Sequence, residues 1–261
     1  MNLGLKGKRA LITGGATGIG KSIAIDLAKE GVKLVITSRD PKELKKTLKE
    51  IGGEKPGHFG ISCHLTNSGA PQKLAKRIFK EIGGLDIVVN NIGSSLGISD
   101  PFCPISDWRK LFRINLEVII EINNQFIPYM MKRKWGRIVN ISSAASMENN
   151  GPVPYCASKA ALTAYSRSMA RVLAPQNIVM SAILPGVVLT ERGHWAQVLK
   201  ERPEHAERYL RERCPLGRFG RPQEISPMVV MLCSELASFA QGAIVPIDGA
   251  QGRHFYQVDG I

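Results

Sequence analysis

The sequence is poor in cysteine and in aromatic residues, and it has no long apolar run. Aromatic residues make up 6% of its 261 residues, and no apolar run reaches the ~18 residues that a membrane-spanning helix needs. The five cysteines include no CxxC pair, and the five histidines show no HxxxH or HExxH spacing, which argues against a disulfide framework or a metal site. The N-terminus lacks a signal-peptide core. We therefore expect a cytoplasmic protein without metal and without a membrane segment.

Positive charge, in contrast, is in excess. The chain has 35 Lys and Arg residues against 22 Asp and Glu residues, which gives a net charge of +13. Such an excess can mark a nucleic-acid binder or a surface that meets anionic ligands. The basic residues are scattered along the chain, and no aromatic-interleaved RNA-binding motif or zinc finger accompanies them. We therefore expect solvated basic helix faces and no nucleic-acid partner.

Short apolar runs rich in β-branched residues alternate with amphipathic stretches along nearly the whole chain. This pattern indicates a parallel sheet with helices on both faces, which is a doubly wound, Rossmann-like α/β fold with its ligand at the carboxyl ends of the strands. No linker or repeat interrupts residues 1–261, so we expect a single domain in which the irregular stretch 191–221 forms a substrate lid. Strands are expected at 10–13, 33–37, 59–64, 87–90, 137–142, 179–184 and 243–247, and helices at 18–30, 41–51, 71–82, 108–131, 155–173 and 222–236.

A glycine-rich turn follows the first expected strand. Residues 13–20 read TGGATGIG and lead directly into a helix. Glycines let the chain turn sharply and bring backbone N–H groups against a pyrophosphate at the helix N-terminus. The position between strand and helix therefore predicts a dinucleotide site. The residues expected to contact the dinucleotide here are Gly14, Thr17, Gly18, Ile19 and Gly20.

Further motifs follow in a fixed order along the chain. They are NNIG at 90–93, Asn115, Ser142–Ser143, YCASK at 155–159, PGVVLT at 185–190 and Asp248–Gly249. With these motifs the sequence resembles the short-chain dehydrogenase/reductase family over residues 7–250, and its overall pattern is similar to the 3-oxoacyl-(acyl-carrier-protein) reductase branch. The resemblance implies hydride transfer between a nicotinamide and a carbonyl or alcohol substrate, and a homotetramer or homodimer.

Tyr155 and Lys159 carry the chemistry that the resemblance implies. Their side chains lie four residues apart and share one face of a helix. A nearby ammonium, joined by a positively charged nicotinamide, would lower the pKa of the phenol from its usual value of about 10. The resemblance implies that Tyr155 exchanges a proton with the substrate oxygen and that Lys159 also binds the nicotinamide ribose. It further implies that a serine orients the carbonyl, and that Asn115 holds a water molecule linked to Lys159.

Two neighbouring serines compete for the role of orienting the carbonyl. Counting back from Tyr155 by the commonest interval in the family gives Ser142, whereas aligning the strand from Gly136 without a gap gives Ser143. The register of a strand fixes which face a side chain occupies, so a gap belongs in the loop that follows. We therefore predict that Ser143 is catalytic and that Ser142 is a structural hydroxyl that satisfies backbone groups.

The end of the second expected strand indicates the coenzyme. An NAD-binding relative would usually carry an acidic residue there to bind the ribose hydroxyls, but this chain has Ser38–Arg39. A small residue leaves room for a 2′-phosphate, and a guanidinium can pair with it, so we expect NADP(H). Asn90 either braces the sheet or touches the coenzyme. The resemblance implies further coenzyme contacts from Leu65, Asn91, Gly93, Val188 and Thr190, besides Tyr155 and Lys159.

Three positions depart from the family pattern, and the substrate stays open. His64 stands where the family has an acidic or amide residue, Ile92 replaces an alanine, and Ala250 replaces a glycine.

The apolar and aromatic residues of the expected lid, with arginines around them, favour an acyl substrate with an anionic end, such as a 3-oxoacyl thioester on an acidic carrier protein. Sugar, steroid and xenobiotic alcohols are alternatives, as is a regulator that binds NADP(H) without turnover.

Overall fold

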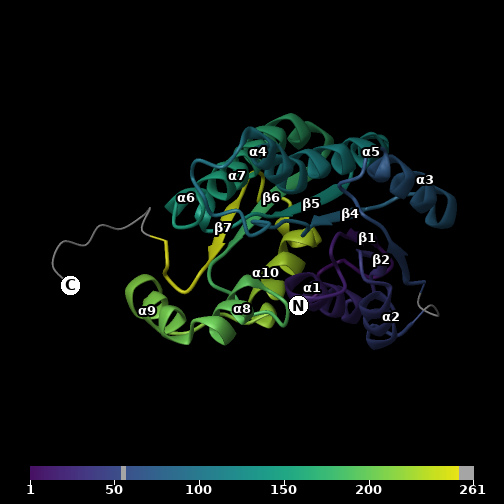
Figure 1. Cartoon of the computed structure of the whole chain (residues 1–261). Helices are drawn as coiled ribbons and strands as arrows, with labels where there is room; N and C mark the ends of the chain where they lie inside the picture. Colours follow the sequence, from purple (N-terminus) through teal and green to yellow (C-terminus); the bar gives the residue numbers. More distant parts are fainter. Residues whose placement is uncertain (54–56, 253–261) are drawn as a thin grey trace.

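One parallel sheet runs through the centre of the molecule (Figure 1). The computed structural model describes residues 1–53 and 57–252. In these residues the seven strands pair in the order β3-β2-β1-β4-β5-β6-β7, and every pairing is parallel. The strands are β1 (Arg9–Ile12), β2 (Lys33–Ser38), β3 (Phe59–Ser62), β4 (Ile87–Asn90), β5 (Gly136–Ile141), β6 (Ile178–Pro185) and β7 (Ile244–Ile247).

Helices cover both faces of the sheet. One buried cluster joins α1, α2 and α10 to one face, and a second joins α3, α5 and α7 to the other, because the strands are apolar on both sides. The helices are α1 (Gly18–Lys29), α2 (Pro41–Glu50), α3 (Ala70–Ile82), α4 (Ile105–Phe112), α5 (Val118–Arg133), α6 (Ala145–Glu148), α7 (Val153–Leu173), α8 (His194–Glu201), α9 (Pro203–Arg213) and α10 (Pro222–Cys233).

The strand order predicts a ligand site between β1 and β4. The chain builds β2 and β3 on one side of β1 and then crosses over to build β4 and the later strands on the other side. Adjacent loops diverge at such a switch point, so ligands bind there at the carboxyl ends of the strands. The predicted doubly wound, Rossmann-like α/β fold in a single domain is confirmed. Of the predicted range 1–261, residues 54–56 and 253–261 lie outside the described part of the chain.

Two predicted segments differ in the structure. The helix expected at 108–131 is divided into α4 and α5 by a π-helical turn at Arg113–Glu117, a wider winding that hydrophobic periodicity does not reveal. The stretch 191–221, expected to be irregular, contains helices α8 and α9. Their aromatic side chains pack together, with the ring of Trp195 4.6 Å from that of Tyr209 and 5.3 Å from that of Phe219.

The apolar residues of α5 serve mainly the core of this chain. Val118, Ile119 and Ile122 are completely buried within the single chain. Val118 and Ile122 belong to the cluster that packs against the sheet, so the core of this chain accounts for their burial. Leu116 and Ile120 of the same segment are half-buried.

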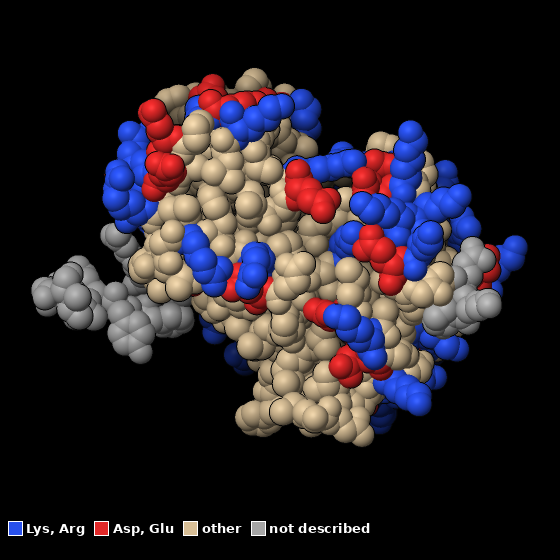
Figure 2. Space-filling model, turned by 90° about the horizontal axis from the view of Figure 1, so that it is seen from below, with Lys and Arg blue, Asp and Glu red and all other residues tan. Residues whose placement is uncertain are grey.

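Charges of both signs are mixed on the face seen in Figure 2. There, Lys and Arg side chains lie beside Asp and Glu side chains. Some of the charges form ion pairs, such as Lys21 with Glu50 at 2.8 Å and Arg218 with Glu224 at 2.7 Å. This mixture differs from the single-sign stripe that is typical of nucleic-acid-binding surfaces.

Neither a membrane-spanning helix nor a cluster of metal ligands occurs in the part of the chain that the structure describes. Within residues 1–53 and 57–252, no helix is both long and apolar enough to cross a membrane. Over the same residues, no three His, Cys, Asp or Glu side chains are grouped so that they could hold a metal ion.

Candidate active site

The glycine turn between β1 and α1 forms a closely packed anion cradle. Gly14 and Gly18 have φ angles of +62° and +53°, the left-handed region that favours glycine. A Cβ atom on Gly20 would lie 2.5 Å from the side-chain nitrogen of Asn91 and closer still to the carbonyl oxygen of Gly14. Helix α1 begins after Thr17 without a side-chain cap and without an acidic residue in its first turn. Its first N–H groups and its dipole therefore fit an anionic group such as a pyrophosphate.

Thr13 and Asn91 fasten this turn to the end of β4. The Thr13 hydroxyl accepts hydrogen bonds from the backbone N–H groups of Asn91, at 2.9 Å, and of Ile92, at 3.0 Å. The Asn91 amide donates to the carbonyl oxygens of Thr13 and Gly14, both at 3.1 Å. Asn91 was predicted to contact the coenzyme, which stays a prediction, and its side-chain amide holds the cradle. Thr13 was not predicted as a site residue, although its place directly before two glycines was a usable signal.

Neighbouring asparagines brace the centre of the sheet. Asn90 pairs with Asn140 in the register of β4 and β5, and its amide donates to the side chains of Asn123 and Asn140, both at 2.9 Å. The prediction for Asn90 left open a brace or a coenzyme contact, and the structure shows the brace. Ile92, the unusual residue of the motif, is half-buried and packs against the second core cluster.

Lys159 and Asn115 converge on Gly93, and Tyr155 lies on the same helix as Lys159. A Cβ atom on Gly93 would lie 2.8 Å from the Lys159 Nζ atom and 2.9 Å from the Asn115 Oδ1 atom, so only glycine leaves room for both side chains. The Lys159 Nζ atom donates to the carbonyl oxygen of Ile141 at 2.9 Å and lies 6.0 Å from the centre of the Tyr155 ring. Helix α7 therefore presents the phenol and the amine on one face, as their spacing predicted.

The π-helical turn positions Asn115. Its Oδ1 atom accepts from the Ser94 N–H at 3.0 Å, and its Nδ2 atom donates to the carbonyl oxygens of Ser94, at 2.9 Å, and Leu111, at 3.0 Å. Because Asn115 is completely buried, these bonds fix the orientation of its amide. The wider turn thus directs a buried amide toward the loop that carries Gly93.

Burial shifts the pKa values of both reactive groups toward their neutral forms. It raises the pKa of Tyr155, an effect partly opposed by a hydrogen bond with Ser143. It lowers the pKa of Lys159 to about 7, because only 3% of that residue is exposed. The predicted lowering of the phenol pKa depends on a positively charged nicotinamide as well as on the amine, so it stays a prediction for the complex with coenzyme. Burial by itself favours the neutral forms of both groups, and a positive charge beside Tyr155 would favour the phenolate.

The two serines after β5 face different neighbours. The Ser142 hydroxyl is buried, donates to the carbonyl oxygen of Lys159 at 3.1 Å and lies 2.9 Å from the Thr163 hydroxyl. The Ser143 hydroxyl forms the hydrogen bond with Tyr155 and accepts from the Ala145 N–H at 3.2 Å. This arrangement agrees with the assignment made from strand register, in which Ser142 is structural and Ser143 faces the phenol.

The residues at the end of β2 leave one arginine exposed to solvent. Arg39 is exposed, and within the described residues no hydrogen bond or ion pair engages its guanidinium. The Ser38 hydroxyl accepts from the Asp40 N–H at 3.1 Å. Asp40 caps α2 and pairs with Arg192 at 3.0 Å, and Arg192 also pairs with Glu43 at 2.8 Å. The carboxylate nearest to Arg39 in sequence is thus already engaged, and Arg192 joins the start of the lid to α2.

The remaining predicted coenzyme residues are divided between the crevice and the core. Leu65 is 4% exposed and belongs to the second core cluster, whereas the neighbouring His64 is exposed. Thr190 reaches the glycine turn, since a Cβ atom on Gly18 would lie 3.1 Å from its methyl group. Val188 is half-buried and forms a bridge with Gly220 at the end of the lid. Ile19 is half-buried and packs on the first core cluster.

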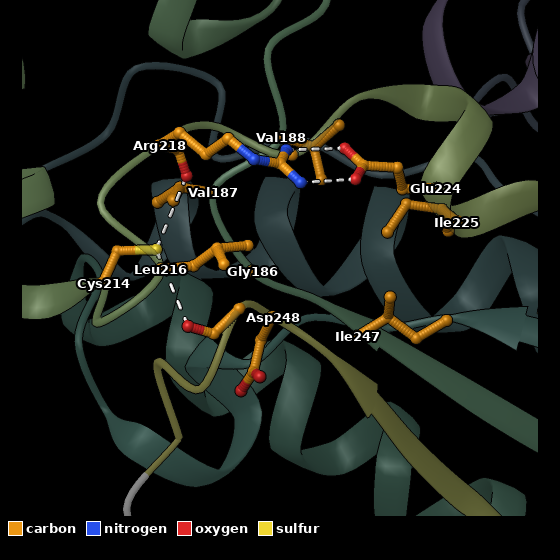
Figure 3. A pocket seen from close by; sticks show the side chains of 12 residues that line it. Gly186, Val187, Val188, Cys214, Leu216, Arg218, Glu224, Ile225, Ile247 and Asp248 are labelled. Atoms are coloured by element: carbon orange, nitrogen blue, oxygen red, sulfur yellow. Dashed lines mark hydrogen bonds and ion pairs between the residues drawn. The ribbon is translucent and has the colours of Figure 1, made fainter.

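A cavity of about 100 Å³ lies beside the segment that follows β6 (Figure 3). It is lined by residues 186–188, by the end of the lid from Cys214 to Gly220, and by the turn after β7. The Cys214 thiol donates to the carbonyl oxygens of Arg218, at 3.6 Å, and Gly249, at 3.9 Å, so it links the lid to that turn. Val188 is the only predicted coenzyme residue in its lining.

The chain is similar to known proteins over nearly its whole length. A family model described as enoyl-(acyl carrier protein) reductase matches residues 14–250. The chain is 34% identical over 255 residues to the 3-oxoacyl-(acyl-carrier-protein) reductase FabG of Aquifex aeolicus, covering 95% of this chain and 99% of the relative. It is similar to the solved structure of L-sorbose reductase from Gluconobacter frateurii complexed with NADPH and L-sorbose, at 27% identity and a TM-score of 0.88, covering 98% of this chain and 100% of that one.

A third relative differs in both substrate and coenzyme. It is a 7α-hydroxysteroid dehydrogenase complexed with NADH and 7-oxo glycochenodeoxycholic acid. The chains are 33% identical with a TM-score of 0.85, and the match covers 95% of this chain and 96% of that one. The relatives thus share a fold and redox chemistry but act on different carbonyl compounds.

Proposed function

This chain belongs to the short-chain dehydrogenase/reductase family, and from that membership we propose that Ser143, Tyr155, Lys159 and Asn115 perform its reaction. The enzyme is an NADP(H)-dependent oxidoreductase that interconverts a carbonyl group and a secondary alcohol. The observation that supports the residue assignment best is the convergence of Lys159 and Asn115 on Gly93, with the Ser143 hydroxyl bonded to Tyr155.

Side chains of the protein orient the substrate oxygen and transfer its proton. Tyr155 donates its phenolic proton to the carbonyl oxygen during reduction and takes it back during oxidation. Ser143 orients that oxygen by a hydrogen bond. Lys159 would hold the nicotinamide ribose and, together with Asn115, would connect to a water molecule that returns the proton. When bound, the nicotinamide supplies or accepts the hydride, and its oxidised form adds the positive charge that favours the phenolate.

NADP(H) fits the residues at the crevice. The uncapped start of α1 and its glycine cradle suit the pyrophosphate, with contacts from Gly14, Thr17, Gly18, Ile19 and Gly20. The free guanidinium of Arg39 suits a 2′-phosphate, while Asp40 is engaged by Arg192 and does not compete for ribose hydroxyls. We assign Ser38, Gly93, Val188 and Thr190 to the same coenzyme.

The assignment is tested by following NADPH oxidation with a panel of carbonyl compounds. Tyr155→Phe is expected to lower kcat by about a hundredfold or more, the usual contribution of a general acid. Tyr165→Phe is the matched control, because it removes from the same helix a phenol hydroxyl that accepts a hydrogen bond from Asn123 at 3.2 Å. Full turnover by Tyr155→Phe would contradict the assignment.

Arg39→Asp tests the coenzyme. Because an aspartate repels a 2′-phosphate and can bind ribose hydroxyls, the ratio of kcat/KM for NADPH to that for NADH should fall below one. An unchanged preference for NADPH over NADH would show that a residue other than Arg39 binds the 2′-phosphate.

The cellular setting and the assembly are proposals of the same kind. We propose a cytoplasmic homotetramer or homodimer in which exposed apolar side chains of α4 and α7 meet a second copy; Ile105, Val153 and Val172 are 65%, 53% and 67% exposed. Light scattering should then give two or four times the chain mass of 28.5 kDa. A monomeric mass at micromolar concentration would contradict this proposed assembly.

A 3-oxoacyl thioester, delivered by an acyl carrier, is one substrate to include in the panel of carbonyl compounds.

A further inference from the structure

A buried hydrogen-bond acceptor lies unused next to the lid. Gln251 follows β7 and is 7% exposed. Its Nε2 atom donates to the Tyr209 hydroxyl at 2.7 Å, but its Oε1 atom has no hydrogen-bond partner in the described part of the chain. An unsatisfied buried polar atom costs about 1–3 kcal/mol, so native structures retain one mainly where another molecule completes it.

The turn before Gln251 holds it firmly in place. The Asp248 carboxylate accepts from the backbone N–H groups of Ala250, at 3.1 Å, and Gly252, at 2.8 Å. Ala250 has a φ angle of +65°, the left-handed region that residues other than glycine seldom adopt. The chain thus keeps a strained residue directly before Gln251, where the usual glycine of the family would relieve the strain. Such strain at a fixed turn points to a positioning role for the next side chain.

The pair of Gln251 and Tyr209 joins the turn after β7 to the segment 191–221. Tyr209 belongs to helix α9, which lies near the end of β7 in Figure 1. Burial raises the pKa of Tyr209, and the thiols of Cys214 and Cys156 add to the rise. The turn after β7 also lies beside the end of β6, since a Cβ atom on Gly186 would lie 2.7 Å from the Asp248 Cα atom. The Ala144 N–H, next to Ser143, donates to the carbonyl oxygen of Pro185 at 3.0 Å, so the turn and Ser143 lie at the same edge of the sheet.

The chemistry of this pair selects a hydroxyl group. The Oε1 atom of Gln251 needs a donor, and the Tyr209 hydroxyl can still donate its own proton. If the Gln251 amide were turned so that its oxygen and nitrogen exchanged places, its N–H donor would lack an acceptor instead. A hydroxyl group both donates and accepts and therefore satisfies either arrangement, whereas an alkyl chain satisfies neither.

We propose that Gln251 and Tyr209 form a subsite that binds a hydroxyl group of the substrate, which makes the substrate a hydroxylated carbonyl compound or polyol rather than an unsubstituted acyl chain. The subsite rests on the function proposed above, because it adds a specificity contact to the same reaction. Its aromatic neighbour Trp195, 4.6 Å from the Tyr209 ring, offers an apolar face to the carbon chain.

Erythrulose and butanone test the subsite, because they have equal carbon chains and differ in their hydroxyl groups. The wild-type enzyme should prefer erythrulose in kcat/KM. Gln251→Leu keeps the size of the side chain and removes its hydrogen bonds, so the ratio of kcat/KM for erythrulose to that for butanone should fall about tenfold or more. Tyr209→Phe should lower the same ratio and carries the test if the first variant is unstable. Gln197→Leu is the control, because this exposed lid glutamine bonds only within its helix, to Glu201 at 2.9 Å.

Calorimetry with erythritol and the enzyme–NADP⁺ complex gives a second readout, in which Gln251→Leu should weaken binding by a similar factor. Equal losses on erythrulose and butanone would assign Gln251 a purely structural role and overturn the subsite. A wild-type preference for butanone or for an acetoacetyl thioester would overturn it as well. Failure to oxidise NADPH with any carbonyl compound would instead contradict the proposed function itself.

Discussion

Replacing Gly20 with alanine separates the effect of this residue on coenzyme binding from its effect on the stability of helix α1. Gly20 is the third residue of α1 and does not have a left-handed φ angle, so alanine would by itself stabilise the helix by about 1 kcal/mol. The new Cβ atom, however, would lie 2.5 Å from the Asn91 side-chain nitrogen and nearer to the Gly14 carbonyl oxygen. These atoms must retreat by roughly 1 Å to reach an ordinary contact distance.

The expected cost falls on coenzyme binding more than on stability. Overpacking of this kind costs about 1–3 kcal/mol, and the gain in helix propensity offsets part of it. The displaced turn carries the N–H groups that face the pyrophosphate, and losing one or two hydrogen bonds to a charged group costs about 1.5–3 kcal/mol. The dissociation constant for NADPH should therefore rise about ten- to a hundredfold, while the melting temperature changes by only a few degrees.

Fluorescence titration with NADPH and a thermal melt measure both quantities. Gly220→Ala is the control, since that glycine also lacks a left-handed φ angle and its Cβ atom would meet nothing closer than 3.6 Å. If Gly20→Ala binds NADPH within twofold of the wild type and melts at a higher temperature, the turn is not the tightly packed cradle described above.

Other predictions follow from single contacts. Ser143→Ala should lower kcat by about a hundredfold with little change in melting temperature, whereas Ser142→Ala should mainly lower the melting temperature, because only the first hydroxyl bonds Tyr155. Arg192→Ala should speed the release of coenzyme at low salt, because it frees the lid from α2, and this effect should fade at high salt. Buried His58 accepts from the Leu34 N–H at 3.1 Å, and burial lowers its pKa. Its contribution to stability is therefore complete above the unfolded-state pKa of about 6.5 and is lost as the pH falls toward the lower folded-state value. His58→Gln should flatten that dependence in thermal melts.

Each of these expectations has a contrary outcome. Loss of turnover in Ser142→Ala at an unchanged melting temperature would reverse the assignment of the two hydroxyls. A salt-independent release rate in Arg192→Ala would mean that the lid does not depend on its ion pairs. An unaltered slope of stability against pH in His58→Gln would assign the acid sensitivity to another group.

The sequence by itself determined the order of the elements, the parallel sheet and which residues are candidates for the reaction. Apolar runs bounded by glycine and proline act over a few residues, and a helix necessarily places Tyr155 and Lys159 on one face. The register of β5 even favoured Ser143 over Ser142, because a strand alternates its faces with a fixed period.

Only the tertiary structure decided how these groups behave. Desolvation depends on neighbours far away in the chain, so the shift of Lys159 to a pKa of about 7 has no signal in the motif that contains it. The π-helical turn at Asn115 and the use of Asn91 as a fastener for the glycine turn also arise from contacts across the sheet. Gln251 and Tyr209 lie 42 positions apart, and their pairing exists only because the lid folds back onto the turn after β7.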